Sequence, residues 1–364
     1  MSLPVATGSD KAAREAVTTY NSIQYLRGIA AILVVIFHLA PPLEQMGYGG
    51  QWPIGLSAGV DIFFVISGFV MWTSTVGRTV TPGAFYRKRL IRIVPLYWLL
   101  TSVMAALLLV MPSAFNTAVF RAPHVIASYL FVPMRNPGKA AMEPLLFPGW
   151  TLNYEMFFYL LFGLFLVTRP AVRLVGIVTV LALLVMAGLE FRPPALTMAS
   201  FYTSPVLLEF AAGLGLGAVA YRRGAARLLP TWAALLCLFG GFVVLLTDPL
   251  PDAIWLLRFG IASMGIVAGA ISLEGRGWVG DWTVPRILGD ASYSIYLTQL
   301  ITMAAFRFLW FRAGPGDFPG AMVIYALLDV GAAIMGGIIC YHLVEKPLLA
   351  LFTRRGERLA KAVA

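Results

Sequence analysis

Long apolar stretches that alternate with short polar segments dominate the pattern of the chain. A helix that crosses the hydrocarbon core of a bilayer needs roughly 20 mainly apolar residues in succession. Ten stretches meet this requirement, so the pattern predicts an all-α integral membrane protein with about ten transmembrane helices. The predicted helices cover residues 23–41, 56–76, 93–111, 149–167, 174–191, 203–221, 229–247, 254–273, 287–310 and 321–343.

Composition and charge support the same class. Of the 364 residues, 59% are hydrophobic and 12% are charged, whereas a soluble domain has about 25% charged residues. If the ten helices alternate in direction, most of the 27 Lys and Arg residues fall on the side of the N-terminus. Basic loops mark the cytoplasmic side, so both termini are predicted to be cytoplasmic. The net charge of +10 then needs no nucleic-acid partner.

The sequence divides into a transmembrane domain (23–345) between two predicted cytoplasmic tails, 1–22 and the basic segment 346–364. The longest predicted loop is 112–148. There is no P-loop, no dinucleotide glycine motif and no Cys/His group with zinc spacing, so no metal or redox cofactor is expected. A G-x-S-x-G elbow is also absent, and Ser67-Gly68 is interpreted as a place where two helices approach closely.

Four titratable side chains are predicted to lie inside the membrane near its outer face. Counting about 1.5 Å per residue from the ends of the predicted helices places His38, Asp61 and Glu155 at one level, with Glu209 as a fourth candidate. A neutral imidazole can take a proton from a hydroxyl group while a carboxylate orients it, which makes His38, Glu155 and Asp61 candidate catalytic residues. The alternative is that these side chains only tie helices together by hydrogen bonds.

Four basic residues stand just before the third predicted helix. Arg89 and Arg92 are three positions apart and share a helix face, and paired guanidinium groups suit phosphate oxygens. Arg87 and Lys88 lie beside them, and Arg27 begins the first predicted helix on the same side. These five residues are candidates for binding a phosphate-bearing donor. The alternative is a topology signal, or contact with anionic lipid head groups.

Several short motifs follow one another along almost the whole chain. In their order and spacing they resemble the motifs of the membrane-bound acyltransferase-3 family, and in particular those of its exopolysaccharide acetyltransferase (ExoZ-like) branch. The motifs are "LRGIAAILVVIFH" with Arg27 and His38, "GVDIFFVISGF" with Asp61, "RLIRIVPLYW" with Arg89 and Arg92, "PGWTLNYEMFFYLLF" with Trp150 and Glu155, "LEFAAGLGLG", "ASYSIYLTQ" and "VEKPL".

The resemblance implies a ten-span enzyme of the bacterial inner membrane that takes an acyl group, commonly acetyl from acetyl-CoA, on the cytoplasmic side. The acceptor would be a hydroxyl group of a glycan or lipid-linked oligosaccharide at the outer side, and polysaccharide assembly proteins are candidate partners. The resemblance also implies that His38 is catalytic and Glu155 supports it, and that the arginines serve the phosphates of the donor. Candidate substrate-binding residues are Trp150, Asn153, Tyr154 and Glu209.

Other readings of the sequence stay open at this point. Buried His, Asp, Glu and Arg in ten spans also fit a proton-coupled secondary transporter, and a non-catalytic scaffold for polysaccharide assembly is a third possibility. For the enzyme, direct transfer and an acyl-histidine intermediate are both consistent with the residues. Nothing in the sequence fixes the acceptor sugar or the identity of the acyl group.

Overall fold

The computed structural model describes residues 20–111, 119–251, 254–314 and 319–353. Within these residues every regular element is a helix, and eight helices are long and apolar enough to cross a bilayer. The predicted all-α membrane fold is therefore confirmed. The other two predicted spans correspond to α7, which has 17 residues, and to the short apolar helix Thr231–Thr247. Most of both predicted tails, 1–19 and 354–364, lies outside the described residues.

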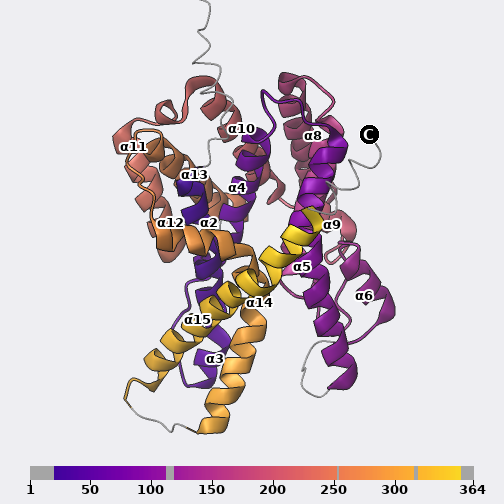
Figure 1. Ribbon diagram of the computed structural model, residues 1–364, viewed down its shortest axis with the longest axis vertical. Coiled ribbons are helices and arrows are strands. Elements are labelled where there is room, and N and C mark those ends of the chain that lie inside the picture. Colours follow the sequence, from indigo (N-terminus) through magenta and orange to yellow (C-terminus); the bar gives the residue numbers. More distant parts are fainter. Residues whose placement is uncertain (1–19, 112–118, 252–253, 315–318, 354–364) are drawn as a thin grey trace, which may run out of the picture.

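The helices pack together into a single bundle (Figure 1). Among the elements labelled η, three are π-helical turns within longer helices, namely η4, η5 and η6. The elements are α2 (Asn21–Phe37), α3 (Ala40–Gln45), η1 (Ile54–Ala58), α4 (Gly59–Thr73), α5 (Pro82–Val110), α6 (Ala122–Tyr129), α7 (Gly149–Phe165), α8 (Pro170–Phe191), α9 (Met198–Tyr202), α10 (Leu207–Arg223), η3 (Ala225–Arg227), α11 (Thr231–Leu235), η4 (Leu236–Gly240), α12 (Gly241–Thr247), η5 (Leu256–Gly260), α13 (Ile261–Glu274), α14 (Thr283–Ala313), α15 (Ala321–Cys340) and η6 (Tyr341–Glu345).

Helix α4 lies inside the bundle and packs closely against α2 and α10 (Figure 1). A Cβ atom at Gly68 would overlap the backbone carbonyl of Phe210 on α10, and one at Gly59 would overlap the carbonyl of Ala30 on α2. Between membrane helices there is no water to drive association, so small residues that let backbones approach stabilise the contact. The interpretation of Gly68 as a close-approach site is confirmed.

The first predicted helix is interrupted at the histidine that it carries. Helix α2 ends at Phe37, and α3 begins at Ala40. Pro41 and Pro42 have no N–H group, so the carbonyls of Phe37 and His38 cannot accept the helical bonds that an unbroken helix would give them. His38 therefore occupies a turn, with its own N–H donating to the carbonyls of Val34 and Val35 at 3.2 and 3.1 Å.

Helix α5 starts earlier than the third predicted span, which began at residue 93. Thr81 caps its N-terminus by accepting a hydrogen bond from the N–H of Ala84 at 3.3 Å, and Pro82 occupies the first turn. Hydropathy marks only the apolar part of a helix, whereas the helix itself includes the basic turn before it. Arg89 and Arg92 consequently lie within α5 and not ahead of it.

The predicted loop 112–148 contains a helix. Within its described part, α6 packs against α5 (Figure 1). The Nε2 atom of His124 lies 2.8 Å from the carbonyl oxygen of Glu143, and Lys139 forms an ion pair with the Glu143 carboxylate at 2.8 Å. The polar residues of this segment therefore bind one another.

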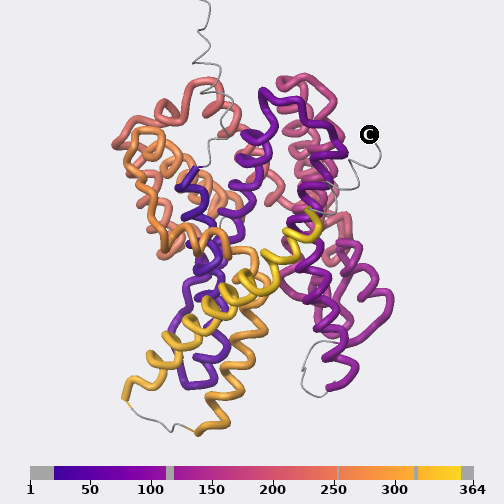
Figure 2. The backbone as a smooth tube through the Cα atoms, viewed as in Figure 1, coloured from indigo at the N-terminus to yellow at the C-terminus, as the bar shows by residue number. Residues whose placement is uncertain are grey.

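Helices α14 and α15 form a hairpin, and the tube in Figure 2 shows α15 crossing the bundle obliquely toward α5. At the end of α15, the π-helical turn η6 contacts α5. An extra residue in one turn rotates the side chains that follow it, and such turns are frequent at functional sites. Here the turn ends at Glu345, whose side chain is buried.

Candidate active site

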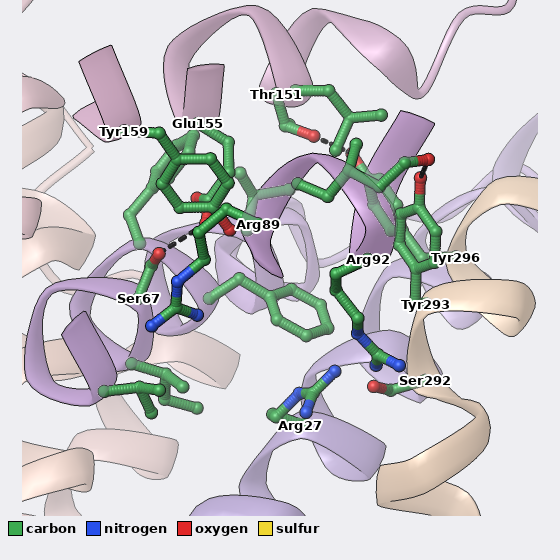
Figure 3. A pocket seen from close by; sticks show the side chains of 17 residues that line it. Arg27, Ser67, Arg89, Arg92, Thr151, Glu155, Tyr159, Ser292, Tyr293 and Tyr296 are labelled. Carbon is green, nitrogen blue, oxygen red and sulfur yellow. Dashed lines mark hydrogen bonds between the residues drawn. The ribbon is translucent and has the colours of Figure 1, made fainter. Parts of the chain in front are cut away.

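A cavity of about 170 Å³ lies between α2, α4, α5, α7 and α14. Three arginines line it, Arg27 from α2 and both Arg89 and Arg92 from α5; we call it the arginine cavity. The guanidinium groups of Arg27 and Arg92 lie close together (Figure 3). Like charges repel one another in such a space, so the arrangement favours an anionic ligand that several guanidinium groups can bind at once.

Each arginine is held by a different neighbour. Arg27 donates to the side-chain oxygen of Gln24 at 3.2 Å, and Arg89 donates to the hydroxyl of Ser74 at 3.1 Å. The Arg89 guanidinium also lies over the ring of Tyr159, 5.6 Å from its centroid. Because a guanidinium carries five N–H donors, these bonds fix the side chains and leave donors for a ligand.

Arg92 is paired with a carboxylate. Its Nη1 atom lies 2.8 Å from Oε1 of Glu345, and the other oxygen of Glu345 accepts a hydrogen bond from the Ser294 hydroxyl at 2.5 Å. The guanidinium also lies over the ring of Tyr293, 5.9 Å from its centroid. Elements α5, α14 and η6 are thereby joined at the wall of the arginine cavity.

Glu155 lies in the arginine cavity as well (Figure 3). Its Oε1 atom accepts a hydrogen bond from the Ser67 hydroxyl at 2.5 Å, and the Tyr159 hydroxyl, one helical turn away on α7, is a second partner. Arg27 and Arg89 are near enough to interact electrostatically with this carboxylate. Two hydroxyl groups and two guanidinium groups thus lie close to this carboxylate.

A second cavity, of about 270 Å³, adjoins the first and shares Val60 and Tyr296 with it. His38 lines this second space, which we call the histidine cavity. The Nδ1 atom of His38 lies 2.8 Å from the carbonyl oxygen of Val34. A carbonyl can only accept, so Nδ1 carries a proton, and when the ring is neutral Nε2 is the nitrogen with the lone pair. Phe147 packs its ring edge-to-face with the imidazole, with the centroids 5.9 Å apart.

Asp61 also lines the histidine cavity and is buried. Its Oδ1 atom accepts a hydrogen bond from the indole N–H of Trp255 at 2.6 Å. The Glu209 carboxyl group, from α10, lies directly beside it. Asp61 and Glu209 therefore form a buried pair of carboxyl groups at the wall of this cavity.

A family model described as an acyltransferase domain, that of the acyltransferase-3 family, matches residues 20–342. The chain belongs to the acyltransferase-3 family. The chain is 39% identical over 325 residues to the exopolysaccharide production protein ExoZ of Rhizobium meliloti (strain 1021), a match that covers 89% of this chain and 96% of that protein. It is also 38% identical over 86 residues to protein 2 in the picA locus of Rhizobium radiobacter, covering 22% of this chain and 41% of that protein. No solved structure matches the chain.

Membership of the acyltransferase-3 family confirms the resemblance that the motifs indicated, and it favours an enzyme over a secondary transporter or a scaffold. An acyltransferase needs a donor site, an acceptor site and a base. In this acyltransferase the arginine cavity has the chemistry of an anion site, and the histidine cavity holds an imidazole whose Nδ1 atom is bonded to a backbone carbonyl. Among the described residues no group of three His, Cys, Asp or Glu side chains is arranged to hold a metal ion.

The structure separates two residues that the sequence placed at one level. Glu155 lines the arginine cavity, whereas His38 lines the histidine cavity. Counting residues from the ends of a predicted span gives a depth, but it does not give the direction in which a side chain points. Asp61, and not Glu155, is the carboxylate that shares the cavity of His38.

Most of the other candidates in this acyltransferase lie away from the two cavities. Arg87 and Lys88 are exposed on the outside of α5, because neighbouring positions on a helix do not share a face. Tyr154 is buried, stacks on the ring of Phe201 and donates its hydroxyl to the Phe201 carbonyl at 2.9 Å. Asn153 is also buried and lines neither cavity, whereas Trp150 lines the histidine cavity.

Sequence reasoning assigned no role to several residues that line the cavities or hold their walls. Tyr159 follows Glu155 by four positions and so shares its helix face. This spacing in the sequence already indicated that the two side chains lie together. Tyr293, Ser294 and Tyr296 belong to the motif "ASYSIYLTQ", and Glu345 belongs to "VEKPL". Both motifs were recognised as landmarks, but nothing local in the sequence indicated that α14 and η6 meet α5.

Proposed function

We propose that this acyltransferase transfers an acetyl group from cytoplasmic acetyl-CoA to a hydroxyl group of an exopolysaccharide, or of its lipid-linked precursor, at the outer side of the bacterial inner membrane. The similarity to an exopolysaccharide production protein supports the class of acceptor. The observation that carries the proposal is the meeting of three arginines in a cavity that adjoins the cavity lined by His38.

Arg27, Arg89 and Arg92 are assigned to the phosphate groups of the donor. Guanidinium forks bind phosphate oxygens in pairs, and the low dielectric of the bundle strengthens each contact. Glu155 cannot favour a polyanionic donor directly, because it is itself an acid. We assign it to holding Arg27 and Arg89 in position, with Ser67 and Tyr159 orienting its carboxylate.

His38 is assigned as the general base. Its Nε2 atom takes the proton from the acceptor hydroxyl, whose oxygen attacks the carbonyl carbon of the thioester. The carbon–sulfur bond then breaks, and the imidazolium returns the proton to the thiolate, so that the products are an ester and free CoA. The bond from Nδ1–H to the Val34 carbonyl keeps the imidazole in the tautomer that this step requires. Asp61, held by Trp255, faces the same cavity and stabilises the imidazolium.

Sealed vesicles of known orientation test this function. Acetyl-CoA supplied only at the cytoplasmic face should acetylate an acceptor at the outer face, and acetyl-CoA supplied only at the outer face should not. The variant Arg89→Ala should raise the KM for acetyl-CoA, and Arg89→Lys should not restore it, because an ammonium group cannot fork. Activity with donor at the outer face alone would overturn the proposed sidedness, and an unchanged KM would remove Arg89 from the donor site.

A further inference from the structure

Tyr296 stands at the junction of the two cavities. It lines both of them, as does Val60, and its own side chain is buried. Its ring packs edge-to-face against Phe63, which lines the arginine cavity, with the centroids 5.9 Å apart. A bulky aromatic side chain therefore separates the space that holds the arginines from the space that holds His38.

A short chain of hydrogen bonds holds this ring in place. The Thr151 hydroxyl donates to the carbonyl of Pro148 at 3.0 Å, so its oxygen can accept from the Tyr296 hydroxyl, which lies 3.1 Å away. The Tyr296 hydroxyl also lies 3.3 Å from the Pro148 carbonyl. Thr151 lines the arginine cavity and Pro148 lines the histidine cavity, so the bonds cross the boundary between them.

We propose that Tyr296 is a coupling residue, which separates the thioester from water in the histidine cavity and so favours transfer of the acyl group over its hydrolysis. The inference rests on the proposed function, because it assumes a donor in the arginine cavity and an acceptor beside His38. The reacting carbonyl must then lie next to Tyr296, since that is where the two cavities adjoin. Holding this ring is the assigned role of Thr151.

The separation has a chemical reason. A thioester reacts with water as it does with a sugar hydroxyl: the water oxygen forms a bond to the carbonyl carbon, the carbon–sulfur bond breaks, and the thiolate takes up a proton. His38 can serve as base for either nucleophile. Without a barrier, water in the histidine cavity would consume the donor whenever no acceptor is bound.

Three variants test the proposal in purified, membrane-reconstituted protein. Tyr296→Ala removes the barrier, Tyr296→Phe keeps the ring but removes its hydroxyl, and Thr151→Val removes one of the two hydrogen-bond partners of that hydroxyl at nearly constant volume. The matched control is Tyr97→Phe, because Tyr97 is buried, donates its hydroxyl to the Ser128 carbonyl at 3.1 Å and lines neither cavity. Acetyl-CoA hydrolysis without acceptor, transfer to acceptor and the Kd for CoA are measured for each.

We expect the ratio of hydrolysis to transfer to rise about fivefold in Tyr296→Phe and Thr151→Val, the factor that corresponds to one lost hydrogen bond of about 1 kcal/mol. The rise should be larger in Tyr296→Ala, and the control should keep the wild-type ratio. The Kd for CoA should stay within about twofold in all of them. Wild-type ratios in both Tyr296→Phe and Thr151→Val, with transfer intact, would overturn the inference.

The two hypotheses fail in different ways. If wild-type protein neither binds CoA nor consumes acetyl-CoA, the proposed function fails before any variant is compared. If the wild type transfers acetyl groups and the Tyr296 variants leak no more than the control, only the coupling role fails. Tyr296→Phe and Thr151→Val change the side-chain volume very little, so both are expected to fold. They therefore still test the coupling role if Tyr296→Ala fails to fold.

Discussion

The ion pair between Arg92 and Glu345 gives a sharp test of how the donor site is built. Glu345 is 1% exposed, and its two oxygens accept from Arg92 at 2.8 Å and from Ser294 at 2.5 Å. The substitution Glu345→Gln keeps the size of the side chain and removes its charge. We expect it to destabilise the protein and to weaken the binding of CoA, because Arg92 loses the group that fixes its direction.

The structure sets the size of both effects. Removing one partner of a fully buried ion pair costs about 3–5 kcal/mol. The Arg92 side chain is 31% exposed, so solvent screens part of the charge left behind, and about 1–3 kcal/mol of stability is expected to be lost. If Arg92 then misses one charge-assisted hydrogen bond to the donor, worth about 1.5–3 kcal/mol, the Kd for CoA rises roughly tenfold or more.

Two measurements on detergent-purified protein check this prediction, the midpoint of thermal unfolding without ligand and the Kd for CoA by calorimetry. The matched control is Glu143→Gln. Its partner Lys139 is also 2.8 Å away, but this pair lies in a loop with 38% of the lysine side chain exposed, so its loss should change stability by less than about 1 kcal/mol. The reasoning is refuted if Glu345→Gln binds CoA as tightly as the wild type, or more tightly, because Glu345 would then only compete with the donor for Arg92.

Two further predictions concern the base and the packing of the bundle. His38→Gln should abolish transfer while leaving the Kd for CoA within about twofold, because His38 lines the other cavity; near-normal turnover in acetyl-transfer assays would exclude His38 as the base. Gly68→Ala should cost about 1–3 kcal/mol, because its Cβ would overlap the Phe210 carbonyl, whereas Gly215→Ala, on the open side of α10, should cost nothing. Equal unfolding midpoints for the two glycine variants would contradict this account of the α4–α10 contact.

The positions of the helices could be predicted from the sequence because the bilayer imposes one simple requirement. A spanning segment must bury its backbone groups in a helix and present apolar side chains to lipid. Hydropathy therefore found a helix in each predicted span, and the small residues Ser67-Gly68 indicated a close approach of two helices. It failed at the ends, because the basic turn with Arg89 and Arg92 is helical without being apolar.

The arrangement of the site was less predictable, for a different reason. His38 and Glu155 were assigned to one level by counting residues along helices, which gives a depth for each residue but not the cavity that its side chain faces. Which cavity a side chain faces depends on the rotation of its helix, which tertiary packing decides. The pairing of Arg92 with Glu345 joins residues 253 positions apart, and no local pattern in either segment indicates the other.

The charges around the arginine cavity bear on turnover as well as on binding. Acetyl-CoA and free CoA carry the same phosphate groups, so a site that binds phosphates binds substrate and product alike. Such uniform binding does not accelerate the chemical step, and very tight binding would delay the release of CoA. In the described structure Glu155 lies beside Arg27 and Arg89, and Glu345 is paired with Arg92. Two carboxylates thus offset part of the charge of three arginines. Because the proposed function also needs these carboxylates to orient the guanidinium groups toward phosphates that both molecules share, any preference for acetyl-CoA over CoA must come from contacts with the acetyl group.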